Sequence, residues 1–332
     1  MHKIALVSGD GIGPEISQAV KTIVAESGAS IEWEEVLLGE IAFKQMGDYL
    51  PQKSIEKIRA KKIALKGPLT TPIGGGFKSI NVTLRKEFNL YANLRPVRNL
   101  PNVQSVRNDI DLVIVRENTE DLYIGSERKV DENTVEAIKL ITRQASERIA
   151  RFAFDYAVQR DRKKVTAVHK ANILKMSDGL FLESARKIAT GYPAIEFNDV
   201  IVDNMCMQMV MYPTKFDVLV MPNLYGDILS DLAAGLIGGL GLAPSANLGD
   251  DFAIFEAVHG SAPNIAGQNA ANPIAMLLSA VMMLEYIGEE KAGARIKKAV
   301  NLALANPDVL TPDLGGKGTT TSLTDEICRH IK

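Results

Sequence analysis

Residues 79–96 read SINVTLRKEFNLYANLRP, and this stretch leads from a helix-like segment into a predicted strand at Leu90–Arg95. It carries Arg85 and Arg95, and a third arginine, Arg116, follows at the end of the next apolar run. A guanidinium group binds a carboxylate through two parallel hydrogen bonds and stays charged at any working pH. If the fold brings the three arginines together, they predict a ligand with more than one carboxylate.

Short apolar runs alternate with longer helical patterns on both sides of this stretch, which is typical of an α/β fold with a largely parallel sheet. The predicted strands are Lys3–Ser8, Lys62–Leu65, Leu90–Arg95, Leu112–Arg116, Lys164–Val168, Asp199–Val202, Phe216–Met221 and Ala253–Ala257. The predicted helices include Pro14–Ser27, Ile41–Met46, Gln52–Ala60, Thr134–Arg160, Asp178–Thr190, Tyr225–Gly235, Asn272–Ile287 and Lys291–Asn306.

The chain has 332 residues, more than one ordinary core holds, so two domains are expected. The glycine cluster Gly235–Pro244 is the best candidate crossing between them, and Pro96 and Pro101 bracket a second. Two crossings predict a discontinuous large domain of residues 1–95 and 236–332, and a small domain of residues 96–235.

The composition, 46% hydrophobic and 23% charged with a net charge of −2, is that of a globular protein. It has no basic tail or stripe, so a nucleic-acid partner is not expected. The two cysteines, Cys206 and Cys328, form no disulfide framework and fit a reducing compartment. A strand follows Met1 directly, without a signal-peptide pattern, and the longest apolar run, Ile274–Leu284, is too short to span a membrane. We therefore expect a soluble, cytoplasmic protein.

The turn Gly9–Pro14 follows a strand, opens a helix and invites a dinucleotide-binding interpretation, with acidic residues about 20 positions on. The third glycine, however, comes one position too early for that motif. A tight turn explains the segment as well, with Pro14 at the first helical position and Glu15 favoured by the helix dipole.

Two carboxylates, Asp227 and Asp231, lie four residues apart in a helical pattern and so share one face of the helix. Like charges at this spacing repel each other unless a cation lies between them. Asp203 is a third acid, at the carboxyl end of a predicted strand, where sites form in α/β proteins. Together with substrate oxygens and water, such carboxylates suit Mg²⁺ or Mn²⁺. The alternative is a helix cap (Asp227) and a solvated charge (Asp231).

Two further side chains are candidates for proton transfer. Lys170 follows a predicted strand and can act as a base if burial or nearby positive charge lowers its pKa. Tyr123 lies seven residues after Arg116, and a phenol can act as a general acid. Each residue taken alone is more often a surface or packing residue. His169 and His259 show no metal-ligand spacing.

Six segments, in the same order and over nearly the whole chain, resemble the β-decarboxylating dehydrogenases that act on isocitrate, 3-isopropylmalate, homoisocitrate and tartrate. They are Gly67–Pro72, Ser79–Pro96, Val115–Glu120, Val168–Lys170, Asn223–Asp231 and His259–Gly267. The resemblance implies the two-domain α/β fold of isopropylmalate dehydrogenase, with a largely parallel sheet and without an ordinary Rossmann site. It also implies oxidative decarboxylation of a hydroxy acid, and for isocitrate a step of the tricarboxylic acid cycle.

The resemblance also implies roles by position. Arg85, Arg95 and Arg116 match the arginines that clamp the malate-like part of the substrate, and Tyr123 and Lys170 match the catalytic pair. Mg²⁺ or Mn²⁺ would bind Asp203, Asp227 and Asp231. The other implied substrate contacts are Ser79, Asn81 and Asn172. The cofactor contacts are Thr70, Thr71, His259, Gly260, Ser261, Ala262, Pro263, Asn264, Ile265, Asn272 and Asp313.

In such enzymes Lys170 and Asp203 would reach into the partner's site, so a homodimer with shared active sites is expected in the small domain. Whether dimers pair into tetramers stays open.

Ser79 and Asn81 favour isocitrate, because a hydroxyl and an amide can bind its third carboxylate. An isopropyl group would leave both without a partner. Homoisocitrate is the second candidate substrate and 3-isopropylmalate the third. Ser79 also suits a helix cap, a role compatible with substrate binding.

NAD is the expected cofactor. Relatives that use NADP carry Lys-Tyr where this chain has Asn264-Ile265, and they carry Tyr and Arg where it has Pro312 and Gly316. This chain therefore lacks the cations and hydroxyls that bind the 2′-phosphate of NADP. NAD-dependent relatives usually carry Asp at position 264, so Asn264 predicts weaker discrimination against NADP.

Two other classes of function remain as alternatives. A non-catalytic regulatory subunit would be expected to lose the lysine, the tyrosine or the metal acids, which this chain keeps. A module that only captured tricarboxylates would not need Asp227, Asp231 and Lys170 together.

Overall fold

The computed structural model describes residues 1–70 and 79–332 and has an α/β fold built on one ten-stranded sheet. The strands follow the order β2-β1-β3-β12-β11-β4-β5-β10-β8-β9, and β6 and β7 form a separate hairpin. The strands are β1 His2–Val7, β2 Ile31–Glu35, β3 Ile63–Lys66, β4 Ala92–Arg98, β5 Asp111–Glu117, β6 Glu127–Lys129, β7 Val135–Ala137, β8 Lys164–His169, β9 Glu196–Ile201, β10 Val218–Met221, β11 Pro244–Leu248 and β12 Ala253–Ala257.

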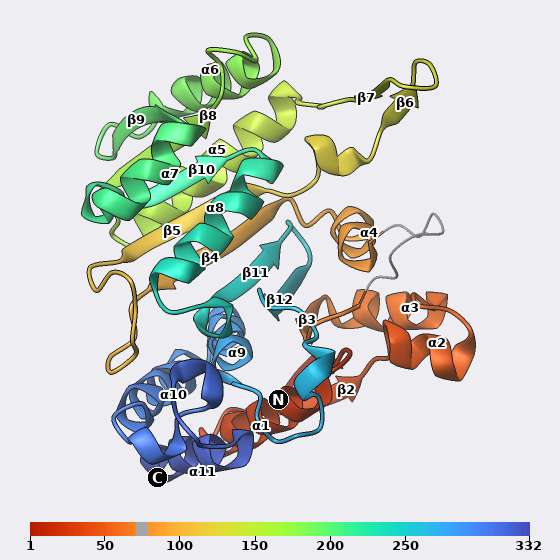
Figure 1. The fold of residues 1–332 in the computed structure, drawn as a ribbon, viewed down its shortest axis with the longest axis vertical. Helices are drawn as coiled ribbons and strands as arrows, with labels where there is room; N and C mark the ends of the chain where they lie inside the picture. The colour runs from red at the N-terminus through yellow and green to blue at the C-terminus, as the bar shows by residue number, and fades with distance from the viewer. Residues whose placement is uncertain (71–78) are drawn as a thin grey trace.

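The α-helices lie on both sides of this sheet (Figure 1). They are α1 Gly13–Glu26, α2 Glu40–Met46, α3 Gln52–Lys61, α4 Ile80–Glu87, α5 Arg143–Gln159, α6 Ser177–Ala189, α7 Val202–Met211, α8 Asn223–Leu236, α9 Ile274–Tyr286, α10 Glu290–Ala303 and α11 Thr320–Ile331. Short 3-10 turns include η1 Leu122–Ile124, η3 Leu240–Leu242, η4 Pro263–Ile265 and η6 Pro312–Leu314.

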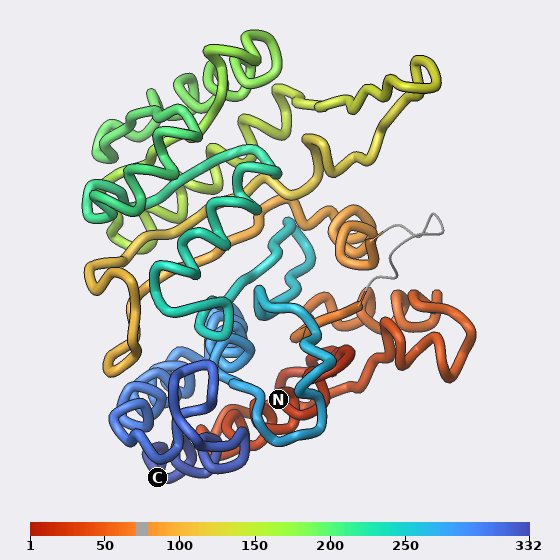
Figure 2. Tube along the Cα trace, viewed as in Figure 1, coloured from red at the N-terminus to blue at the C-terminus, as the bar shows by residue number. Residues whose placement is uncertain are grey.

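The sheet is parallel on both flanks and antiparallel in the middle. Strand β11 pairs antiparallel with β12 and with β4, and β4 pairs antiparallel with β5. The segments from the two chain ends lie together in the lower half of the molecule, and the middle of the chain forms the upper half (Figure 2). The predicted domain division at residues 95/96 and 235/236 stays a prediction, because the sheet runs continuously through both halves.

Each predicted strand is present within a few residues of its predicted bounds, and the α/β class is confirmed. The prediction of one helix over Thr134–Arg160 was wrong at its start. Residues 135–137 form β7, and α5 begins only after Thr142, whose side chain accepts a hydrogen bond from the Ala145 amide. Val135, Ile138 and Ile141 have helical spacing, but the hairpin pairing with β6 overrides it. In the described part of the chain, no helix is long and apolar enough to cross a membrane.

Candidate active site

The three arginines converge where the antiparallel middle of the sheet meets α4. Arg95 pairs in register with Ile114, and Arg116 with Asn93, so both arginines project from the same face of the β4–β5 pair. Arg85 comes from the last turn of α4. Ser79 caps this helix, because its hydroxyl accepts from the Val82 amide at 3.5 Å. The predicted cap and the predicted convergence are both observed.

All three guanidinium groups are buried, and two of them have unused donors. Arg85 Nε and Arg95 Nε and Nη1 have no hydrogen-bond partner among the described residues, and neither does Asn81 Oδ1. Burial, followed by repulsion from Arg116 and Arg85, lowers the pKa of Arg95 to about 10. Burial also lowers the pKa of Arg85, although Glu256 offsets part of this effect. Buried donors without a hydrogen-bond partner are costly, so this cluster is suited to receive an anion.

Arg116 is held by α8. Its Nε and Nη2 atoms donate to Asn223 Oδ1 at 2.9 and 2.7 Å, and its Nη1 atom forms an ion pair with Asp227. Gly226 allows this approach, because a Cβ atom there would lie 2.4 Å from Arg116 Cγ. Three residues of the Asn-Leu-Tyr-Gly-Asp segment, Asn223, Gly226 and Asp227, therefore form the face of α8 that packs against Arg116.

Tyr123 lies beside this pair, in η1. Its hydroxyl donates to Asp227 Oδ2 at 2.5 Å, and Arg116 Cζ lies 4.9 Å from the centre of its ring. Burial and the Asp227 hydrogen bond raise the pKa of Tyr123. Burial acts to raise the pKa of Asp227 as well, but Arg116 and Tyr123 outweigh it and hold that pKa below its ordinary value.

Asp231 lies one turn after Asp227 on α8, at the mouth of the arginine cluster. Its Oδ1 atom is 3.9 Å from Arg95 Nη1, and burial raises its pKa, partly countered by Arg95. Two partly exposed carboxylates on one helical face suit a hard divalent cation that keeps water and substrate oxygens as further ligands. Among the described residues of one chain, no group of three or more acidic, histidine or cysteine side chains is close enough to hold a metal.

Asp203 and Lys170 are not part of this cluster within one chain. Lys170 follows β8 and pairs with Asp203 in the first turn of α7, and this pair lowers the pKa of Asp203. Strands β5, β10 and β8 are parallel neighbours and their register places Val168 level with Arg116, so Lys170 lies just beyond the same carboxyl end of the strands, with one strand between it and Arg116. Asn172 is exposed on the turn after Lys170.

The predicted cofactor residues gather around the loop 259–267. Ser261 Oγ accepts from the Thr70 hydroxyl at 2.9 Å, and the Ser261 carbonyl accepts from the Ile12 amide at 2.9 Å. Gly11 adopts a positive φ of +57°, and a Cβ atom there would lie 1.9 Å from the Ser261 oxygen. The N-terminal glycine turn thus supports this loop by packing. Thr71 lies outside the described residues.

The remaining cofactor candidates surround the same loop. Asn272 Nδ2 donates to Asp313 Oδ2 at 2.9 Å, and Thr311 holds the other Asp313 oxygen. Burial lowers the pKa of His259, and its Nε2 atom is buried without a partner among the described residues. Gly260, Ala262, Pro263, Asn264 and Ile265 are exposed, with Ala262 in the left-handed region at φ 39°.

A buried polar chain behind Arg85 was not predicted. Glu256 forms ion pairs with Lys66 at 2.5 Å and with Arg85 at 3.6 Å, and it accepts from Asn247 at 2.7 Å. Burial acts to raise the pKa of Glu256, but Lys66 and Arg85 reverse this and hold it at about 2. The sequence signal was a charged residue in each of two otherwise apolar strands, Lys66 in β3 and Glu256 in β12.

Comparison with known proteins gives consistent matches over the whole chain. Residues 3–328 match the isocitrate/isopropylmalate dehydrogenase family. The chain is 51% identical to a mitochondrial catalytic subunit of NAD-dependent isocitrate dehydrogenase from Arabidopsis thaliana, over 98% of this chain and 87% of that protein. It is 49% identical to a mitochondrial regulatory subunit of the same enzyme from Dictyostelium discoideum, over 100% and 92%. It is also similar to the crystal structure of isocitrate dehydrogenase from Methylococcus capsulatus, with a TM-score of 0.96, 52% identity, and coverage of 100% of this chain and 99% of that one.

Proposed function

Because the chain belongs to the isocitrate/isopropylmalate dehydrogenase family, we propose that it catalyses the NAD-dependent oxidative decarboxylation of isocitrate to 2-oxoglutarate and CO₂. The observation that carries this proposal is the cluster of three buried arginines, with unused donors, beside Asp227 and Asp231. Relatives of about 50% identity over nearly the full chain carry the same activity in their names.

The arginines hold the substrate. The free donors of Arg85 and Arg95 point to a ligand with several carboxylate oxygens, and each hydrogen bond between two charged groups adds about 1.5–3 kcal/mol. Ser79 and Asn81, at the start of α4, supply a hydroxyl and an amide for the third carboxylate. These two polar groups favour isocitrate over 3-isopropylmalate, since a branched apolar group would leave them unpaired.

Tyr123 is the candidate acid that would give a proton to the substrate carbon that loses CO₂. Its raised pKa keeps the hydroxyl protonated at neutral pH, and the hydrogen bond to Asp227 fixes its orientation. Lys170 is the candidate base for the substrate hydroxyl.

Asp227 and Asp231 would hold Mg²⁺ or Mn²⁺, joined by Asp203 of a second copy. The bound ion would supply Lewis-acid stabilisation of negative charge on the substrate oxygens. The loop 259–267, with Asn272 and Asp313, would hold NAD, whose chemistry would supply the hydride acceptor.

A homodimer supplies what one chain lacks, since Lys170 and Asp203 pair with each other and not with the arginine cluster. Exposed apolar side chains gather on and near the elements that carry them: Ile173, Met176, Met207, Val210, Met211 and Ile228. Such side chains favour burial against a second copy. Several relatives are named as catalytic or regulatory subunits, so a mixed assembly is the alternative.

The predicted cytoplasmic location stays a prediction, and these relatives are named as mitochondrial.

A coupled assay tests the substrate. Purified protein with Mg²⁺ and NAD is expected to form NADH with isocitrate at a kcat/KM well above that with homoisocitrate or 3-isopropylmalate. Turnover with homoisocitrate alone would overturn the choice of substrate but leave the reaction class intact. No turnover with any of the three would favour a regulatory subunit.

Asn264 tests the choice of cofactor. It is exposed in η4, and its amide oxygen can accept from a ribose hydroxyl without repelling a phosphate. Asn264→Asp is expected to raise the ratio of kcat/KM for NAD over NADP by about tenfold, from one added charge repulsion. Asn269→Asp is the matched charge control, because Asn269 is exposed on the same loop and its Oδ1 only accepts, from the Thr321 amide and hydroxyl, which a carboxylate can still do. An unchanged ratio in Asn264→Asp would contradict the assignment.

A further inference from the structure

A cavity of about 750 Å³ lies on the face of the sheet opposite the arginine cluster. This volume is in the range that holds small-molecule ligands. We call it the rear cavity and define it by Leu94, Phe152, Tyr156, Ala246, Phe255 and Met282. None of the catalytic, substrate, cofactor or metal candidates described above lines it.

The rear cavity and the arginine cluster lie on opposite faces of the same strands. Side chains alternate between the two faces along β4, so Leu94 and Pro96 line the cavity while Arg95 projects to the other side. In the same way Ala246 of β11 lines the cavity, while its neighbour Asn247 joins the polar chain behind Arg85. The two sites therefore share a backbone but no side chain.

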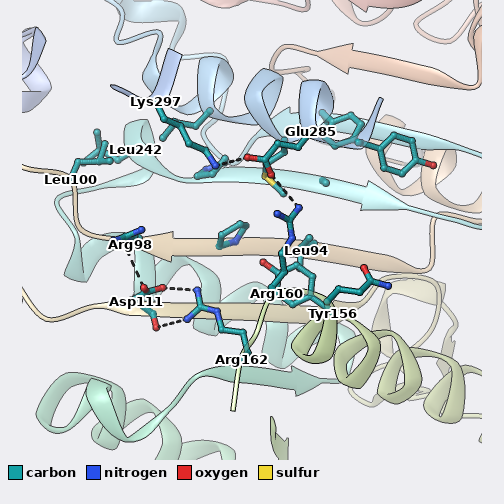
Figure 3. Close-up of a pocket in the computed structure, with 18 of the residues that line it drawn as sticks. Leu94, Arg98, Leu100, Asp111, Tyr156, Arg160, Arg162, Leu242, Glu285 and Lys297 are labelled. Atoms are coloured by element: carbon teal, nitrogen blue, oxygen red, sulfur yellow. Dashed lines mark hydrogen bonds and ion pairs between the residues drawn. The ribbon is translucent and has the colours of Figure 1, made fainter. Parts of the chain in front are cut away.

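The walls of the rear cavity come from two different parts of the chain. Phe152 and Tyr156 come from α5, and Met282 and Glu285 from α9. One ion pair connects the walls: Arg160, directly after α5, donates to Glu285 Oε2 at 3.1 Å (Figure 3).

The charges at this wall are unequal. The Glu285 carboxylate also pairs with Lys297 of α10, so one anion serves two cations. The side chains of Arg160 and Lys297 are 54% and 53% exposed. An incoming anion could take one of these cations and leave Glu285 paired with the other. The floor beneath them is apolar and aromatic. The two other carboxylates that line the cavity already have partners: Asp111 pairs with Arg98 and Arg162, and Asp155 accepts from the Tyr192 hydroxyl at 2.6 Å.

We propose that the rear cavity binds a small organic anion with an aromatic body, and that its occupancy changes the affinity of the arginine cluster for isocitrate. The anionic group binds Lys297 or Arg160, and the aromatic body packs on the floor. Movement of β4 and β11 under the ligand displaces Arg95 and Asn247, which lie one residue from the cavity floor. Because the two binding equilibria are linked, isocitrate must change the affinity of the rear cavity for its ligand by the same factor. The coupling rests on the proposed function, whereas the binding does not.

The test uses 8-anilinonaphthalene-1-sulfonate, an aromatic anion whose fluorescence rises in an apolar site. With the full chain and saturating NAD, we expect saturable binding of one probe molecule per chain. Lys297→Ala is expected to weaken it about tenfold, from one lost charge-assisted contact. Lys298→Ala, on the adjacent exposed position of α10, is the matched control and is expected to bind as wild type. Met282→Trp, which fills the cavity, is expected to abolish binding of the probe.

The outcomes are separable. Displacement of the probe by NAD, or equal binding by Lys297→Ala and Lys298→Ala, overturns the site, and this comparison decides even if Met282→Trp does not fold. For the coupling, calorimetry measures isocitrate binding with and without the probe. A shift in wild type that is absent from Met282→Trp supports the coupling, and identical affinities overturn it. If isocitrate does not bind at all, the proposed function fails while the probe still reports on the cavity.

Discussion

Arg95 illustrates a conflict between stability and binding at a single residue. It is buried, and two of its nitrogen atoms have no hydrogen-bond partner among the described residues. Arg95→Met would remove this buried charge, so we expect the free energy of unfolding to rise by about 1 kcal/mol. The loss of two charge-assisted contacts to substrate, about 3 kcal/mol, is expected to lower kcat/KM for isocitrate about 100-fold. Denaturant unfolding and steady-state kinetics measure the two effects. Arg98→Met, on the exposed end of the same strand, should change neither.

Glu256 gives the pH dependence expected at this scale. Its folded pKa of about 2 lies below its ordinary value of 4.5, so the ionised carboxylate stabilises the fold fully above pH 4.5. This stabilisation is lost as the pH falls from 4.5 towards 2. Glu256→Gln leaves Lys66 and Arg85 buried without a carboxylate, which is expected to cost about 3 kcal/mol at neutral pH. The difference between wild type and variant should shrink as the pH falls below 4.5. A constant difference across that window would contradict this account.

The sequence predicted individual residues best where chemistry demanded a type. The prediction that the arginines lie together is confirmed, because the register of β4 and β5 puts Arg95 and Arg116 on one face. One face of α8 then brings Asp227 into contact with both Arg116 and Tyr123. Glu256 and Lys66 could not be predicted as a pair, since their contact joins neighbouring strands that are far apart in the chain.

At the scale of elements, the N-terminal turn and the loop 259–267 depend on each other. Gly11→Ala would place a Cβ atom 1.9 Å from the Ser261 carbonyl oxygen and also strain a positive φ. We expect a loss of about 2 kcal/mol or more in the free energy of unfolding and a raised KM for NAD, with KM for isocitrate unchanged. Thermal unfolding and kinetics with each substrate varied are the measurements.

Gly47→Ala is the matched control for this prediction. Gly47 also has a positive φ, but none of the described residues lies within 4 Å of a Cβ atom built there. It should therefore cost about 1 kcal/mol for the backbone alone and leave KM for NAD unchanged. Equal effects of the two substitutions would show that Gly11 is needed only for its own conformation.

Two of the strands that the sequence analysis missed, β11 and β2, show what a local pattern can and cannot identify. Strand β11 contains Pro244, Ser245 and Asn247, poor strand formers, and it is held by hydrogen bonds from Asn93 to Ser245 and Asn247 at 2.9 Å. Strand β2 carries Glu32, Glu34 and Glu35 on an edge, without an apolar run. Local pattern could not identify β11, because partners distant in the chain define it, whereas the alternation of Ile31 and Trp33 with Glu32 and Glu34 was a strand signal that the prediction missed.

At the scale of the whole molecule, the position of Lys170 decides how many chains form one active site. Within a chain, Lys170 pairs with Asp203, and Tyr123 pairs with Asp227, at separate places on the same sheet edge. If the site combines Tyr123 of one copy with Lys170 of the other, then Lys170→Met and Tyr123→Phe are each nearly inactive, but a mixed dimer has one intact site. Random pairing after joint refolding makes about half of the dimers mixed, so about a quarter of wild-type activity should return.

The control for this experiment is refolding of each variant alone, with oligomeric state measured by light scattering. If Tyr123 and Lys170 act within one chain, no combination of the two variants contains an intact site, and the mixture stays as inactive as its components. Recovery with a dimeric mass would establish a shared site. Recovery of activity at a monomeric mass would contradict it, because a shared site needs two copies in one particle.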